Sequence, residues 1–187
     1  MAQTILNSGK YSLSIISLQD TEQSFTGSLF KGVRFFNLKI SNIKIFKYFN
    51  FYSRVKNIIK ENKFDVIIAS DLYSLSGVCS SNNKVIYDSR EIYSELEAHV
   101  TKPLYCWFWK KYEKYYLQFI KDVIVTADSD AVFLRNLYPF KNLSFYTIFN
   151  YPKYQQYIKT NLLREKFNIS ENCKIILYQG VIQGGRG

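Results

Sequence analysis

The chain has 187 residues, a formal net charge of +10, 47% hydrophobic residues and 18% aromatic residues. This length allows one full domain and a fragment of another, and the apolar content excludes a wholly disordered chain. No run approaches the about 18 uncharged apolar residues of a spanning helix, and residues 1–19 are too polar for a signal peptide. The basic charge fits a solvated surface, anionic lipid, nucleic acid or a phosphorylated ligand.

The beginning, "AQTILNSGKYSLSIIS", predicts the end of a helix, a stop at Gly9 and then a strand. In an α/β fold such a helix normally follows a first strand. No strand precedes it here, so we expect the first strand of the fold to be missing.

Short apolar runs recur along the chain and predict strands. Most are continuous rather than alternating, which indicates burial on both faces of a parallel sheet. A weaker strand over residues 32–40 is expected at an edge. The stronger runs cover residues 11–18, 64–70, 84–89, 122–128, 143–150 and 174–180.

Helical patterns fill the gaps between these strands. The alternation predicts an α/β fold, with a Rossmann-like, doubly wound, mostly parallel sheet. We expect a first domain over residues 1–150 and the start of a second over 151–187. The predicted helices cover residues 45–63, 102–121, 129–138 and 152–169, the last one broken.

The helix at 102–121 has one wide apolar face. Its lysines at 110, 114 and 121 are expected opposite that face. The main interpretation is packing on the sheet. Docking on anionic lipid is the alternative, with Trp107 as its best support. The apolar arc holds Leu104, Phe108, Tyr112, Tyr115 and Phe119, with Tyr105, Trp109, Tyr116 and Ile120 beside it.

Ligands of open α/β sheets bind outside the carboxyl ends of the strands, so the residues that follow each strand are the site candidates. Asp71 follows one strand and either lines a cleft or caps the next helix. Asp88, Arg90 and Glu91 follow another, and a functional cluster is favoured over a local ion-pair group.

Two further strands end in candidate residues. Asp128 or Ser129 is expected to be the N-cap of the following helix, and Ser129 is also a candidate for the cleft. Asn150, before Tyr-Pro, is either a turn residue or a functional one.

The ending "KIILYQGVIQGGRG" reads as a strand followed by a glycine-rich turn. It has neither the GK[ST] of a P-loop nor the spacing of GxGxxG. Glycines still let backbone N–H groups approach a phosphate, and Arg186 can pair with that anion.

The cysteines and the single histidine give little indication of a metal site or of redox chemistry. Cys79, Cys106 and Cys173 lie far apart, and with His99 they form no zinc set, so no metal is predicted. An odd number of cysteines without a signal peptide fits a reducing cytoplasm. The expected location is therefore cytoplasmic, at or near the inner face of the membrane.

Taken in order, these motifs resemble the amino-terminal half of a family 4 glycosyltransferase with the two-domain GT-B architecture. The resemblance covers nearly the whole chain, and the ordered set is more specific than any one motif. The motifs are "FDVIIASDLYSL", "KVIYDSREIYSE", "WFWKKYEKYY", "DVIVTADSDAVFLRNLY", "IFNYP", "LREKFNI" and "ILYQGVIQGGRG".

The resemblance implies an acceptor-side first domain and a second domain that binds a nucleotide-sugar as co-substrate. It implies a retaining hexosyltransferase with no cofactor and no required metal, acting on a lipid-linked or saccharide acceptor in cell-envelope or exopolysaccharide synthesis. The family's paired-glutamate donor motif is absent, so we expect the 187 residues alone to lack activity.

Carried over residue by residue, the resemblance places Asp71, Asp88, Arg90, Glu91 and Ser129 in the acceptor-side cleft. Many relatives carry D-x-H-E where this chain has "DSRE", so the histidine role does not transfer to Arg90, which can instead contact a phosphate. The resemblance places Asn150 at the interdomain crossover and assigns donor phosphate binding to Gly184, Gly185 and Arg186.

Two other functions stay open. One is a non-catalytic, basic Rossmann-like module that binds nucleic acid or an anionic surface. However, no nucleic-acid-binding module is recognisable, and we expect no nucleic-acid partner. The other is a different GT-B enzyme, such as a nucleotide-sugar epimerase.

Overall fold

The computed structural model describes residues 2–19, 32–39, 44–79, 81–96, 102–152, 154–156 and 160–178, with only the backbone of 19, 39 and 44–49. The chain divides into two units, Met1–Phe149 and Asn150–Gly187.

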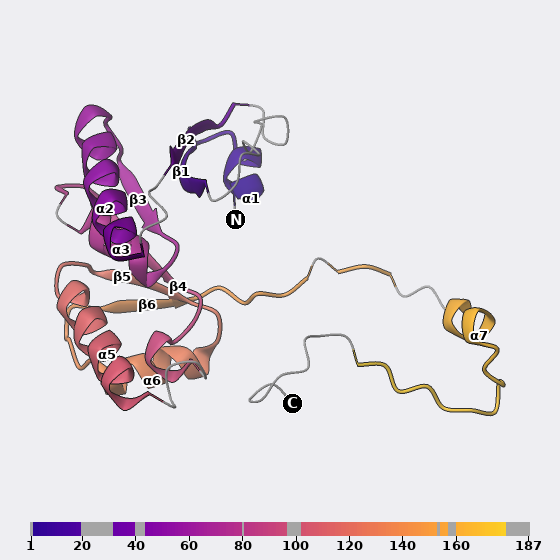
Figure 1. Cartoon of the computed structure of the whole chain (residues 1–187). Helices are drawn as coiled ribbons and strands as arrows, with labels where there is room; N and C mark the ends of the chain where they lie inside the picture. Colours follow the sequence, from indigo (N-terminus) through magenta and orange to yellow (C-terminus); the bar gives the residue numbers. More distant parts are fainter. Residues whose placement is uncertain are drawn as a thin grey trace. The chain divides into compact units, whose positions relative to one another are not determined.

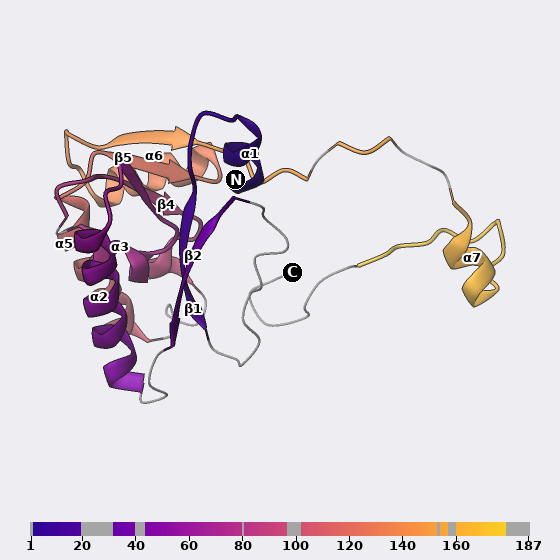
Figure 2. The same cartoon turned by 90° about the horizontal axis from the view of Figure 1, so that it is seen from above.

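The first unit begins with helix α1 (Ala2–Asn7) and strand β1 (Ser14–Gln19), as predicted. Between them Gly9 has a φ of 64°, the left-handed conformation that ends many helices, so the predicted stop is confirmed. Strand β2 (Arg34–Lys39) pairs with β1 in parallel, and Figure 2 shows the two strands side by side. Helix α2 (Lys44–Glu61) follows.

A four-stranded parallel sheet forms the larger part of the unit (Figure 1). Its order is β3 (Val66–Ala69), β4 (Lys84–Ser89), β5 (Asp122–Val125) and β6 (Ser144–Thr147). The intervening helices are α3 (Leu72–Val78), α5 (Pro103–Leu117) and α6 (Asp128–Leu137), with a short 3₁₀ turn, η2 (Tyr93–Glu95), before α5. The α/β class with parallel strands is confirmed, and it is compatible with a Rossmann-like doubly wound fold.

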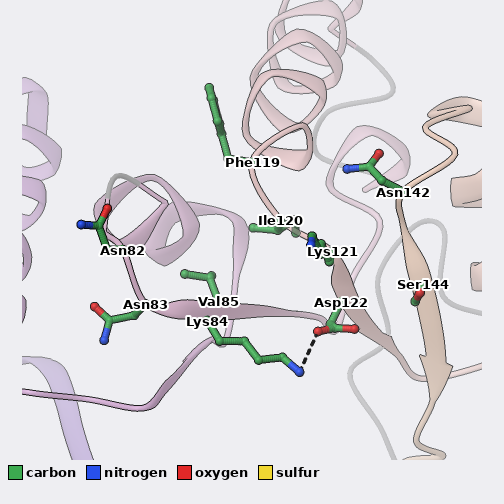
Figure 3. Close-up of a pocket in the computed structure, with 10 residues that line it drawn as sticks. All are labelled: Asn82, Asn83, Lys84, Val85, Phe119, Ile120, Lys121, Asp122, Asn142 and Ser144. Atoms are coloured by element: carbon green, nitrogen blue, oxygen red, sulfur yellow. Dashed lines mark ion pairs between the residues drawn. The ribbon is translucent and has the colours of Figure 1, made fainter.

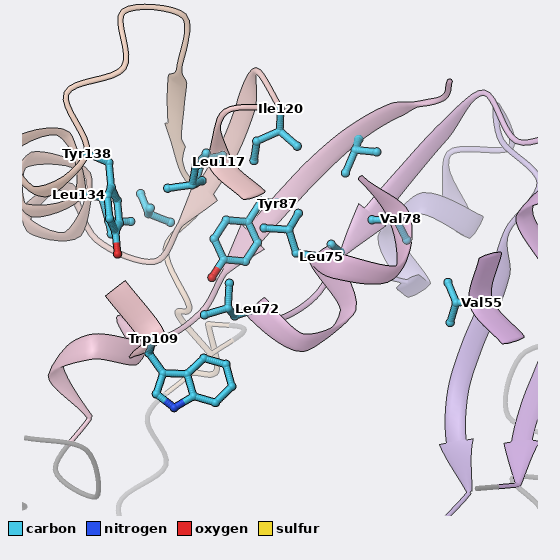
Figure 4. Packing of buried hydrophobic residues seen from close by; sticks show 14 of the residues in the cluster. Val55, Leu72, Leu75, Val78, Tyr87, Trp109, Leu117, Ile120, Leu134 and Tyr138 are labelled. Carbon is cyan, nitrogen blue, oxygen red and sulfur yellow. The ribbon is translucent and has the colours of Figure 1, made fainter. Parts of the chain in front are cut away.

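The core lies on one face of this sheet. Crossovers between parallel strands are almost always right-handed. With the order β3-β4-β5-β6 this rule puts α3, α5 and α6 on the same face, and residues of all three helices join one buried cluster. Tyr87 of β4 is fully buried, and Leu72 of α3 and Trp109 of α5 lie near its ring (Figure 4). Val123 of β5, which is paired with Tyr87 by register, is also fully buried.

The opposite face of the sheet differs from the prediction. Ile68, Ile86 and Ile124 share that face by register and are only half-buried, and Tyr146 beside them is exposed. Burial on both faces was expected from the continuous apolar runs. Burial of this face is incomplete: Asp88 is buried there, but the isoleucines keep part of their surface exposed.

Helix α5 packs by a different stripe from the predicted one. Trp109, Glu113 and Leu117, spaced four residues apart, are its buried residues. The predicted packing of this helix on the core is confirmed for Trp109 and Ile120, which are buried, and for Tyr112 and Tyr116, which pack against the core. Leu104, Phe108, Tyr115 and Phe119 of the predicted arc are exposed instead. The centre of the inward face was wrong because aromatic residues lie on both sides of this helix.

The second unit contains helix α7 (Leu162–Phe167), and this is the helical part of the predicted segment 152–169 among its described residues. Asn168 ends it with a φ of 50°, in the left-handed region. The strand predicted over 174–180 is wrong for its described part, since residues 174–178 form no strand and Ile176 is 96% exposed. Among the described residues, no strand pairs with this segment.

Candidate functional site

The carboxyl ends of four neighbouring strands meet at one edge of the larger sheet. Because β3 to β6 are all parallel, the residues that follow Ala69, Ser89, Val125 and Thr147 lie along that edge. The first-unit residues predicted for the site therefore share one edge, although they approach one another only in local groups.

Asp71 is the N-cap of α3, as its alternative interpretation predicted. Its carboxylate accepts a hydrogen bond from the backbone N–H of Ser74 at 2.6 Å. The Ser74 hydroxyl oxygen accepts one from the backbone N–H of Asp71 at 3.2 Å, which completes a capping box. One carboxylate oxygen of Asp71 is thus committed to holding the helix.

Asp88 and Arg90 form an ion pair at the end of β4. The distance from Arg90 Nε to Asp88 Oδ2 is 3.1 Å. Asp88 is 3% exposed, whereas the Arg90 side chain is 60% exposed. Because the buried carboxylate holds the guanidinium by Nε, the two terminal nitrogens lie toward the exposed end of the side chain.

Glu91 is exposed and does not join this ion pair. Its backbone carbonyl accepts a hydrogen bond from the Ser89 hydroxyl at 3.4 Å. The local ion-pair interpretation is therefore confirmed for Asp88 and Arg90, whereas Glu91 forms no ion pair with any other described residue.

The side chains that follow β5 make hydrogen bonds other than the predicted ones. The N-cap of α6 is Ala127, with no side-chain hydrogen bond, so the N-cap role predicted for Asp128 or Ser129 is wrong. Asp128 instead accepts a hydrogen bond from Thr147 of the neighbouring strand. Ser129 is exposed, and its hydroxyl donates to Asp130 at 3.4 Å. The carboxylates of Asp128 and Asp130 thus accept hydrogen bonds from hydroxyl groups. Their negative charges in the first turn of α6 also interact favourably with the helix dipole.

The remaining predicted residues lie outside this edge. Asn150 is exposed and is the first residue of the second unit. Gly184, Gly185 and Arg186, as well as His99, lie outside the described residues. The structure therefore gives no geometry for the predicted phosphate loop.

Glu113 of α5 is a buried acid that the sequence interpretation missed. It has no exposed surface, and it accepts hydrogen bonds from the Tyr87 hydroxyl at 3.0 Å and the Tyr138 hydroxyl at 2.8 Å. Burial raises the pKa of Glu113 above its ordinary value, and the two tyrosine donors oppose that rise. Its spacing of four residues from both Trp109 and Leu117, which puts the three on one face of the helix, could have predicted its burial.

A separate hollow of about 530 Å³ lies at the opposite, amino edge of the sheet (Figure 3). Lys84 and Asp122, the first residues of β4 and β5, form an ion pair there at 3.1 Å. Asn82, Asn83 and Asn142 supply polar groups around it, and Phe119 supplies an exposed ring. None of the predicted site residues lines this hollow.

The described part of the chain offers neither a metal-binding cluster nor a membrane-spanning helix. No group of three or more histidine, cysteine or acidic side chains there is placed to hold a metal ion. No described helix is long and apolar enough to cross a membrane. All three cysteines are free.

Comparison with known proteins adds no family to this geometry. No protein-family model matches the chain, and a search of curated proteins finds no match.

Proposed function

We propose that the chain is the acceptor-side part of a family 4 glycosyltransferase, which transfers a sugar from a nucleotide-sugar to a lipid-linked or saccharide acceptor. The observation that carries the proposal is the Asp88–Arg90 pair in the "YDSRE" loop. It supplies an exposed cation at the carboxyl edge of a parallel α/β sheet, where ligands of such folds bind.

Arg90 is the binding residue in this proposal, and Asp88 positions it. A guanidinium has five N–H donors in a planar fork, and two of its nitrogens stay available when Nε is paired. Such a fork recognises phosphate oxygens in bidentate fashion. A diphosphate-linked acceptor, which carries its charge next to the sugar or lipid, is the ligand that this arrangement favours.

The first test measures binding of farnesyl diphosphate, a short isoprenoid diphosphate, to the full chain by backbone amide NMR. Inorganic pyrophosphate serves as a probe for the charged group alone. We expect chemical-shift changes at residues 88–91 and 126–130 with both ligands. Loss of charge-assisted hydrogen bonds in Arg90→Ala is expected to weaken binding about 10-fold or more.

Lys84 provides a matched control. Its side chain is 61% exposed, close to that of Arg90, and it is also paired with a strand-end carboxylate, but at the opposite edge of the sheet. Lys84→Ala is expected to leave binding unchanged. Equal loss in both variants would show non-specific attraction to a basic protein and contradict the proposal, as would the absence of binding at millimolar ligand.

A further inference from the structure

The outward side of α5 exposes large apolar side chains that no described element covers. Leu104 is 83% exposed and Trp107 is 60% exposed. We call this set the α5 outer stripe. Its members are exposed, large and hydrophobic: Leu104, Trp107, Phe108, Tyr115 and, just beyond the helix end, Phe119.

Helix geometry makes the stripe continuous. An α-helix turns about 100° per residue, so positions 104, 108, 115 and 119 fall within one narrow arc and 107 lies beside it. The buried Trp109, Glu113 and Leu117 lie on the other side of the helix. The stripe is therefore a single face, separate from the face that packs on the core.

The charges next to the stripe have one sign. Lys111 and Lys114 are exposed on the same side of α5. The only acidic residue of the helix is Glu113, which is fully buried between two tyrosine hydroxyls. On the flank, Lys110 is paired with Glu95 of the preceding turn at 3.2 Å. The exposed side of the helix is thus aromatic and cationic.

Ring contacts tie part of the stripe to the rest of the molecule. Tyr115 and Phe119 stack edge to face with ring centroids 5.3 Å apart. Phe108 contacts the buried Trp109 ring at 5.2 Å. These rings are arranged before any partner arrives, so binding orders few side chains.

We propose that the α5 outer stripe docks in the plane of an anionic lipid bilayer. Trp and Tyr suit the boundary between headgroups and acyl chains because each has an apolar body and a polar tip. Lysines beside an apolar face meet the lipid phosphates. The helix lies on the surface rather than crossing it, consistent with the absence of a spanning helix among the described residues.

Two other occupants fit the stripe less well. A second copy of the chain would bring the same lysines against each other, and like charges oppose such pairing. Single-stranded nucleic acid is bound along a groove that follows its backbone, whereas the stripe is the outward face of a helix. The lipid proposal stands independently of the glycosyltransferase proposal, since it uses none of the carboxyl-edge residues.

The first experiment is co-sedimentation of the full chain with vesicles of phosphatidylglycerol and phosphatidylcholine, compared with phosphatidylcholine alone. We expect binding to the anionic vesicles only, weakened by salt. Each lysine near an anionic surface contributes about five-fold, so Lys111→Gln/Lys114→Gln is expected to lower partitioning roughly 25-fold. The control is Lys60→Gln/Lys63→Gln, which removes two exposed lysines at and just after the end of α2. The partitioning of this variant is expected to stay close to that of wild type.

The second experiment uses the two tryptophans, of which Trp107 is exposed and Trp109 is buried. Vesicles with brominated acyl chains are expected to quench Trp107 fluorescence, and Trp107→Phe should remove that quenching while Trp109 remains. Trp107→Ser is expected to weaken partitioning about ten-fold or more, because an aromatic contact with the bilayer is lost. Tyr11→Ser, at an exposed aromatic in another segment, is the control.

Three results would overturn the proposal. One is equal binding to neutral and anionic vesicles. Another is unchanged binding in both the lysine pair and the Trp107 variants, with circular dichroism confirming that they are folded. The third is protection of Trp107 from a soluble quencher by self-association or by single-stranded DNA, with no binding to anionic vesicles.

Discussion

Tyr138, the residue that follows α6, donates its hydroxyl hydrogen bond to Oε2 of Glu113 in α5 at 2.8 Å. Tyr87 of β4 donates to the other carboxyl oxygen at 3.0 Å. One buried acid therefore joins a strand, a helix and the residue that ends a second helix. Its removal is expected to affect stability more than any surface charge of the chain.

We expect Glu113→Ala to lower the free energy of unfolding by about 3 kcal/mol or more. Two buried hydroxyls lose their acceptor, and a cavity replaces the side chain. Urea unfolding at pH 7 measures the change. Glu95→Ala is the control. This partly exposed acid pairs with Lys110 and accepts one hydrogen bond from the Ser94 hydroxyl, so its loss should cost only about 1 kcal/mol. Equal costs in the two variants would contradict the prediction.

The same carboxyl makes stability depend on pH. The pKa of Glu113 is raised above its ordinary value of 4.5 by burial, so the folded chain binds its proton more tightly than the unfolded chain does. The resulting stabilisation is complete below pH 4.5 and is lost as the pH rises through the raised pKa. In Glu113→Gln this dependence should disappear, which urea unfolding between pH 4 and 8 can measure. A Glu113→Gln profile parallel to that of wild type would be the contrary result.

Tyr87→Phe and Tyr138→Phe should each cost about 1 kcal/mol, because each removes one buried hydrogen bond and leaves the other. The double variant leaves the buried carboxyl with neither donor, so its cost should exceed the sum of the two. A double-mutant cycle from urea unfolding measures the difference. Strict additivity would mean that the two tyrosines act independently.

Asp71→Ala should destabilise the chain by about 1 kcal/mol, since the N-cap of α3 is lost. Asp71→Asn is the matched variant, because its side-chain oxygen still accepts from the Ser74 N–H, and it should remain close to wild type. Thermal unfolding of the two variants compares them directly. A larger loss in the asparagine variant would indicate that the charge, rather than the cap, is what matters.

Cys79 should be the slowest of the three thiols to react. Burial raises the pKa of its thiol to about 12, so roughly one thiol in ten thousand is ionised at pH 8. Cys173 is exposed and should react first. Timed alkylation followed by mass spectrometry gives the order, and urea should make the two rates converge. Fast alkylation of Cys79 in the native chain would show that its segment opens readily.

Much of the first unit could be predicted from the sequence, because its strands are short apolar runs that end in polar residues. Residues 84–89 were predicted as a strand, and β4 has those bounds. The stop at Gly9 was also predicted, because the left-handed conformation found there favours glycine.

The rest depended on tertiary contacts. A glutamate in a lysine-rich helix is normally solvated, so the position of Glu113 follows only once the two tyrosines are placed beside it. The predicted N-cap of α6 was wrong because the Asp128 carboxylate accepts a hydrogen bond from Thr147 instead of capping the helix. Thr147 belongs to a strand nearly 20 residues further along the chain. Residues 174–178 carry a strand-like pattern, but among the described residues they have no neighbouring strand.

The strand order has a consequence for local unfolding. β4 and β5 pair along both edges, whereas in the described part of the chain β1 and β2 pair only with each other. Amide protons in a two-stranded ladder can exchange with solvent through a small opening, while those of central strands wait for a larger one. Hydrogen–deuterium exchange should therefore find its most protected amides at residues 85–88 and 123–125, and much weaker protection at 14–19.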